Sequence, residues 1–233
     1  MISLGDLRAG DLGFGPIGGL VPGVFPVGVG EVLVAPVKHL TNWRRWWTLR
    51  HVGTVTQAAD ERWRPGGGKV GGPLFAQAMP SGFEEIQIGD EHWKPGWIYL
   101  RPNYSPPLTG TRSRTGEKIL LGVGQADNVA AIARRMVRKK IPYGFEDFAA
   151  MAGHRAGIHS HGLDEFIARV DADGDPVRAI CSQAVDAQLT QSGGLLNGHV
   201  FDDNRLAQDV DPSELYLRLL DIGVAMVFRP GVA

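Results

Sequence analysis

Glycine and proline divide the first hundred residues into short runs, and this division restricts the fold more than any other feature of the sequence. The chain holds 32 Gly and 15 Pro among its 233 residues, which indicates many turns and loops. Between the turns lie short β-branched and apolar runs, within residues 7–14, 50–56, 74–79, 85–88 and 97–100. Strands this short with tight connections pair with their chain neighbours, which predicts an antiparallel sheet.

Helical patterns follow the strands. From Asp127, a predicted N-cap, apolar residues recur at helical spacing up to a basic last turn. A short helix is predicted in residues 145–151, another begins at Cys181, and a last one opens at Asp211 with Pro at its first position. Strands first and helices afterwards predict an α+β fold. We expect one domain over residues 1–233, with a Gly/Pro-rich insertion at about residues 15–40.

Charge and composition exclude several classes of partner. Lys plus Arg number 24 against 25 Asp plus Glu, so no overall field favours nucleic acid or an anionic membrane. Residues 12–37 are nearly uncharged and long enough to raise the question of a membrane span, but their Gly and Pro argue against a helix. We therefore expect no integral span. The N-terminus lacks a basic segment before an apolar run, so we expect no signal peptide, and a cytoplasmic chain or a virion-associated one if phage-encoded.

Cys181 is the only cysteine of the chain and stands where a helix is predicted to begin. A thiol at a helix N-terminus lies at the positive end of the macrodipole beside unpaired N–H groups, which lowers its pKa and offers donors to an oxyanion. Such a thiol is prepared as a nucleophile. The alternative is a small buried residue on the inner face of the helix.

A thiol nucleophile needs a base, and His51 is the best placed of the seven histidines. It opens a predicted strand behind an aromatic segment that contains Trp43, Trp46 and Trp47. A cluster of this kind packs a loop onto the core, stacks on bases, lies at a membrane interface or lines a substrate groove. His51 itself is either a structural histidine or the general base of the site.

Two groups of residues resemble metal ligands without matching a known spacing. Residues 171–176 begin like a calcium loop, but the Gly comes at the fourth place and Ser182 stands where a bidentate Glu is needed. A solvated turn is predicted there. His154, His159 and His161 fit no helical pair of zinc ligands. We predict no metal and no cofactor.

Five segments, taken in order, resemble a known family. They are Leu-Arg-Ala-Gly-Asp-Leu at 7–12, His-Val-Gly-Thr-Val at 51–55, Gln-Ala-Met-Pro-Ser-Gly at 77–82, Ile-Pro-Tyr-Gly at 141–144 and Cys-Ser-Gln-Ala-Val at 181–185. Together they resemble the circularly permuted branch of the NlpC-type papain-like cysteine peptidases, which includes the YiiX-like proteins and, more distantly, lecithin:retinol acyltransferase. The hallmark is the order, with the histidine strand first and the Cys-Ser helix late.

The resemblance implies a papain-like fold in which the antiparallel sheet packs against the helix bearing the cysteine. It makes Cys181 the nucleophile, His51 the general base and later the acid, and Gln77 the group that orients His51. The family often has an acidic residue or a second histidine in place of Gln77. A neutral amide holds the imidazole but adds no ion pair.

The resemblance further implies the substrate and the residues around it. Tyr143, Ser182 and Trp47 are expected to line the substrate site, and a peptide or other amide of the bacterial cell wall is expected to be cleaved through an acyl-enzyme. An acyltransferase or lipid amidase on the same site is one alternative. A structural or binding component that keeps the fold, for example in a phage tail, is the alternative from a different class.

Overall fold

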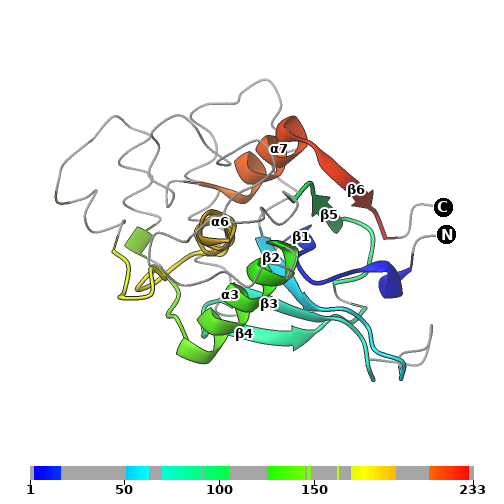
Figure 1. The fold of residues 1–233 in the computed structure, drawn as a ribbon, viewed down its shortest axis with the longest axis horizontal. Helices are drawn as coiled ribbons and strands as arrows, with labels where there is room; N and C mark the ends of the chain where they lie inside the picture. Colours follow the sequence, from blue (N-terminus) through cyan, green and yellow to red (C-terminus); the bar gives the residue numbers. More distant parts are fainter. Residues whose placement is uncertain are drawn as a thin grey trace, which may run out of the picture.

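The strands form one antiparallel sheet. The computed structural model describes residues 3–16, 51–62, 70–90, 92–104, 125–144, 146–147, 162, 169–192 and 210–230. Within these residues the sheet has six strands in the order β4-β3-β2-β1-β5-β6 (Figure 1). They are β1 (Leu12–Gly15), β2 (His51–Gln57), β3 (Leu74–Met79), β4 (Gly82–Gln87), β5 (Ile98–Pro102) and β6 (Val224–Phe228). Every pairing is antiparallel, as predicted.

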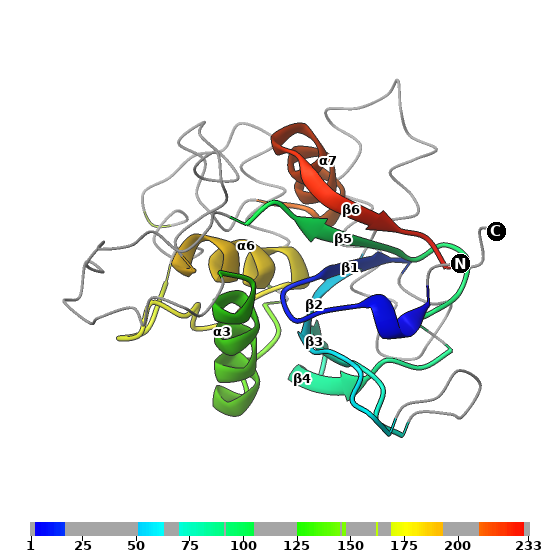
Figure 2. The same cartoon turned by 45° about the vertical axis from the view of Figure 1, so that its right-hand side comes forward.

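The three described α-helices pack on one side of this sheet, whereas Leu4 of the short 3-10 helix packs with the aromatic cluster on the other side. The described helices are the 3-10 helix η1 (Leu4–Asp6), α3 (Gln125–Lys139), α6 (Cys181–Gln191) and α7 (Pro212–Ile222). Figure 2 shows α3 and α6 crossing each other beside the sheet. Both contact β2 and β3, and α6 also packs against α7. The predicted combination of an antiparallel sheet with helices packed on it is confirmed.

Side chains alternate between the two faces of the sheet. Val52, Ala76 and Ala78 point toward the helices and belong to the larger apolar cluster. Phe75 points the other way, into a second cluster that is rich in aromatic rings. A Cβ at Gly53 would lie 2.5 Å from the Phe75 ring and from the Ala76 carbonyl oxygen. Glycine at this position therefore lets the aromatic layer lie flat on β2.

The last strand was not predicted. β6 pairs with β5, with Phe228 opposite Tyr99, so the expectation that all strands precede the helices is wrong. Its five residues follow a helix directly, and their pairing partner lies far away in the chain, so local pattern does not identify them as a strand. β4 begins at Gly82 instead of residue 85, because it follows directly on the turn at residues 80–81.

The helix starts were predicted with mixed success. α7 has Asp211 as its N-cap, whose Oδ1 accepts N–H donors from Ser213 and Glu214 at 2.8 Å, as expected. α3 begins at Gln125, so Asp127 lies in its first turn and is not the N-cap. A carboxylate in the first turn interacts favourably with the helix dipole, which explains the signal. Of the helix predicted at residues 145–151, residues 146–147 are helical and the rest lie outside the described residues.

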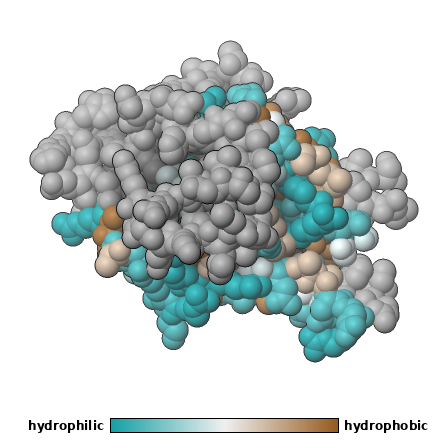
Figure 3. Space-filling view, in the orientation of Figure 1, coloured by the Kyte–Doolittle hydropathy of each residue, from teal (hydrophilic) through white to brown (hydrophobic). Residues whose placement is uncertain are grey.

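The described surface carries mainly polar side chains along α3 and β4. Figure 3 shows hydrophilic residues along the lower edge of the view, where these two elements lie. Within the described residues, no helix combines the length and the apolar composition needed to cross a bilayer. The Gly/Pro-rich run lies outside the described residues from residue 17 onward.

Candidate active site

His51 and Gln77 are in contact across neighbouring strands. In the β2–β3 register Gly53 lies opposite Gln77, so His51 sits diagonally from Gln77 on the same face. The Nε2 atom of His51 lies 2.8 Å from Oε1 of Gln77, and both side chains are buried. The hydrogen bond expected between these two residues is therefore present.

The other end of the Gln77 amide has a partner that the sequence did not suggest. Nε2 of Gln77 donates to Oε1 of Glu84 at 2.9 Å. Glu84 lies directly opposite Gln77 in the β3–β4 register. His51, Gln77 and Glu84 thus form a polar chain across three adjacent strands. The sequence feature that could have revealed Glu84 is the two-residue turn after Met79. Once β4 is known to begin at Gly82, this turn sets Glu84 opposite Gln77.

The surroundings of His51 keep its imidazole neutral. The residue is 7% exposed and lies edge-to-face with the Trp97 ring at 6.3 Å between centroids. The pKa of His51 is lowered to about 4, mainly because the ring is buried. The hydrogen bond with Gln77 raises this pKa in part, and the nearby His92 lowers it further. At neutral pH the ring can therefore accept a proton at one nitrogen while it donates from the other.

Cys181 is the first residue of α6, as predicted. Its helix is preceded by Ile180 in an extended conformation, whose N–H donates to Oε1 of Gln183 at 2.9 Å. Cys181 is 1% exposed and belongs to the apolar cluster between the helices and the sheet. Burial of this kind is what the structural alternative predicts for an isolated cysteine.

Cys181 and His51 are on neighbouring elements but belong to different layers. α6 packs directly on β2. Strand alternation directs His51 and Gln77 to the face opposite Val52 and Ala76, which share the apolar cluster with Cys181. The structure therefore brings His51 to Gln77 and sets Cys181 against the other face of the same strands. His51 is the first residue of β2, so a proton transfer between its ring and the sulfur would require a path around the beginning of this strand.

The residues expected to line the substrate site have different placements. Tyr143 is buried and bridges to Ala179, two residues before Cys181, so it lies beside the entry to α6. The Ser182 hydroxyl is fully buried and donates to the carbonyl of Val210, so this side chain is committed to holding the segment before α7. Trp47 lies outside the described residues.

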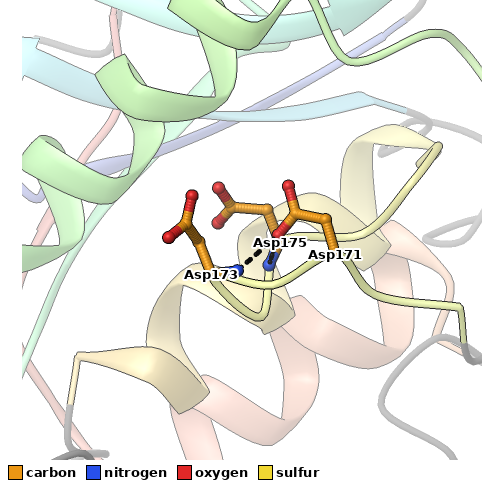
Figure 4. A group of neighbouring side chains, drawn as sticks. All are labelled: Asp171, Asp173 and Asp175. Atoms are coloured by element: carbon orange, nitrogen blue, oxygen red, sulfur yellow. Dashed lines mark hydrogen bonds between the residues drawn. The ribbon is translucent and has the colours of Figure 1, made fainter.

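The residues 171–175 form a turn in which acidic side chains gather. Figure 4 shows Asp171, Asp173 and Asp175 on the loop that leads into α6, and their ligand atoms lie within 4.8 Å of one another. Nζ of Lys139 is 2.6–2.7 Å from an oxygen of each of the three carboxylates. A cation of the protein itself therefore takes the place that a metal ion would take.

This turn is more than the solvated loop that we predicted. The Asp175 side chain is fully buried, and Arg135 donates to both of its oxygens at 2.6 and 2.8 Å. Burial raises the pKa of Asp175, but the bonds from Arg135 and Lys139 outweigh it, and the net pKa is lowered. Two basic residues of α3 thus hold the loop before Cys181. His154, His159 and His161 lie outside the described residues.

Asp186 is a buried acid that the sequence analysis did not single out. It lies on α6, is 2% exposed, and burial raises its pKa to about 7. Aspartates on helices are mostly exposed, so the spacing of residues in this helix does not predict that Asp186 is buried.

Comparison of the chain with protein-family models, with curated proteins and with solved structures gives no match in any of the three. The resemblance described above therefore remains a prediction from the sequence motifs.

Proposed function

We propose that the chain is a thiol-dependent amide hydrolase with a papain-like, permuted NlpC-type fold, in which Cys181 attacks and His51 serves as base and acid. The observation that carries this proposal is the buried hydrogen bond between His51 and Gln77, 2.8 Å long, on a histidine that is neutral at pH 7. A neutral imidazole held by an amide oxygen has its second nitrogen available as a proton acceptor, which is the arrangement that a thiol nucleophile needs.

The reaction follows from these groups. His51 takes the proton of the Cys181 thiol, and the sulfur attacks the amide carbonyl. The tetrahedral oxyanion is stabilised by N–H groups at the start of α6, which is where an oxyanion hole is expected. His51 then protonates the leaving amine, and water cleaves the acyl-enzyme with His51 again as base. The motifs favour a cell-wall peptide or amide as substrate, in the cytoplasm or on a virion, and an acyl acceptor other than water would give the acyltransferase alternative.

One observation favours a second candidate, a binding or assembly component such as part of a phage tail. Cys181 is 1% exposed within an apolar cluster, and the His51 side chain points from the other face of the sheet. A cysteine in such a position contributes to packing whether or not the protein catalyses a reaction.

Alkylation of Cys181 by iodoacetamide distinguishes the two. As the only cysteine, it gives a clean signal in the folded wild-type protein. For the hydrolase, the rate should rise with an inflection clearly below about 8.5, the free-thiol value, and His51→Ala should shift the inflection upward. Gln57→Ala, at the exposed far end of β2, is the matched control and should leave the profile unchanged.

The same measurement can reject the proposal. A sulfur that reacts only after denaturation supports the binding component. So does a pH profile that His51→Ala does not alter. Hydrolysis of cell-wall fragments, with Cys181→Ala as the inactive reference, then tests the substrate.

A further inference from the structure

The amide of Gln77 is held at both ends, and its two ends are chemically different. The oxygen end meets His51 at 2.8 Å and the nitrogen end meets Glu84 at 2.9 Å. A carboxylate accepts hydrogen bonds and donates none, so the NH2 end of the amide must face Glu84. The oxygen end must then face His51.

This orientation determines where the imidazole carries its proton. An amide oxygen only accepts, so the ring nitrogen facing it, Nε2, must bear the hydrogen. In a neutral ring the other nitrogen, Nδ1, then holds a lone pair. Burial lowers the pKa of the ring to about 4 and keeps it neutral at physiological pH. The tautomer therefore decides which ring nitrogen can accept a proton.

We propose that Glu84 is a positioning residue that, through the Gln77 amide, fixes His51 in the tautomer protonated at Nε2. The inference rests on the proposed function in one respect, because it identifies Nδ1 as the nitrogen that would take the thiol proton. Glu84 lies on β4 and its register pairing with Gln77 holds the two side chains side by side on one face. The Glu84 carboxylate does not touch the imidazole and acts on it only through the Gln77 amide that lies between them.

The chain supplies a matched control in the next residue. Glu85 points to the opposite face of β4, where it accepts from the Thr56 hydroxyl and lies 3.5 Å from Arg134. Removing Glu85 takes the same charge from the same strand without touching Gln77. The contrast between Glu84 and Glu85 therefore separates the polar chain from a general effect of charge or strand stability.

The test is NMR of the full-length protein labelled with 15N at histidine. The spectrum distinguishes the two neutral tautomers, and a His51→Gln sample identifies the His51 signals. Wild type and Glu85→Ala should both show His51 protonated at Nε2. Glu84→Ala should populate the second tautomer. Glu84→Lys offers Gln77 only donors, so the amide should turn over and His51 should become predominantly protonated at Nδ1.

The outcome is separable from that of the proposed function, because the spectrum needs no turnover. A folded Glu84→Lys or Glu84→Ala protein that keeps the wild-type tautomer overturns the role of Glu84, as does Glu85→Ala changing it equally. If Glu84→Lys reverses the tautomer while alkylation of Cys181 is unaffected, the role of Glu84 stands and the hydrolase proposal fails. If alkylation also slows, by about 10-fold or more, both are supported.

Discussion

At the scale of single residues, the contact between His51 and Gln77 could be predicted from the motifs, whereas its support by Glu84 could not. The family resemblance assigned Gln77 as the residue that orients His51, and in the observed β2–β3 register the two side chains lie diagonally on one face, within hydrogen-bond reach. Glu84 depends on where β4 begins, and a strand assigned from residue 85 leaves it in a turn.

Substitution of Gln77 tests the polar chain of His51, Gln77 and Glu84 at its middle residue. Gln77→Ala should fold and lose activity by roughly 10-fold to 1000-fold, less than Cys181→Ala, because orientation is only part of a general-base contribution. Gln77→Glu would put a second carboxylate against Glu84, and like charges this close repel. We therefore expect this variant to be destabilised, with one proton shared by the two acids.

In the double variant Gln77→Glu with Glu84→Gln, the carboxylate at position 77 can accept hydrogen bonds from both the His51 ring and the amide NH2 at position 84. A carboxylate beside His51 then favours the imidazolium, so the pKa of His51 should rise above its wild-type value of about 4. NMR titration of His51 measures the change, with circular dichroism as the folding control. An unchanged His51 pKa in the double variant would show that residue 77 does not face the ring.

Asp186 should make the protein less stable as the pH rises. Its pKa is raised to about 7 in the folded protein, against about 3.9 in an unfolded chain. Between these values the folded state binds more protons than the unfolded state, so the free energy of unfolding falls with increasing pH. Asp186→Asn removes this dependence and should be more stable than wild type by roughly 2–4 kcal/mol above pH 7.

Urea unfolding at pH 5 and pH 8 measures this effect as the difference between wild type and variant. Asp221→Asn, an exposed acid on α7, is the control and should follow the wild-type dependence. If Asp186→Asn shows the same loss of stability between the two pH values as wild type, Asp186 is ionised in the folded state at neutral pH.

At the scale of elements, α3 holds the loop that delivers Cys181 to the start of α6. The sequence predicted that this helix ends in basic residues, and two of them, Arg135 and Lys139, bind the acidic turn. Periodicity predicted the helix and most of its buried face, including Val129, Ile132 and Met136, because these depend on local spacing. The partners of the charged face depend on a loop some 40 residues later, which no local pattern identifies.

Arg135→Met tests this support. Asp175 would lose its two-bond partner while its side chain stays fully buried, so the free energy of unfolding should fall by roughly 1–3 kcal/mol, between the values for surface and buried pairs. Asp175 has a lowered pKa in the folded state, so its contribution is present above about pH 4 and is lost as the pH falls through the folded value.

Arg138→Met removes an exposed cation from the next turn of α3 and serves as the control in urea unfolding at pH 7. Equal destabilisation by both substitutions would assign the effect to net charge. The specific pair requires that Arg135→Met alone is destabilising and that the difference shrinks below pH 4.

At the scale of the whole molecule, the sequence predicted an antiparallel sheet with helices packed on it because short strands joined by turns have few other ways to pair. The long-range features were not predictable in the same way. The pairing of β5 with β6 joins distant parts of the chain, and the assignment of His51 and Cys181 to opposite faces depends on the alternation within β2. Motif order alone does not specify these relations.

The position of β6 also decides when the sheet can be completed during protein synthesis. β1 to β5, α3 and α6 all leave the ribosome before β6 does, and early segments begin to fold while later ones are still being made. At about 5–20 residues per second, the stretch between Pro102 and Val224 takes roughly 6–24 s to synthesise. During that time β6 cannot yet pair with β5, and a strand edge without its partner invites pairing with another nascent chain. Pairing with β6 satisfies this edge of β5, and β6 then becomes the outer strand on that side of the described sheet.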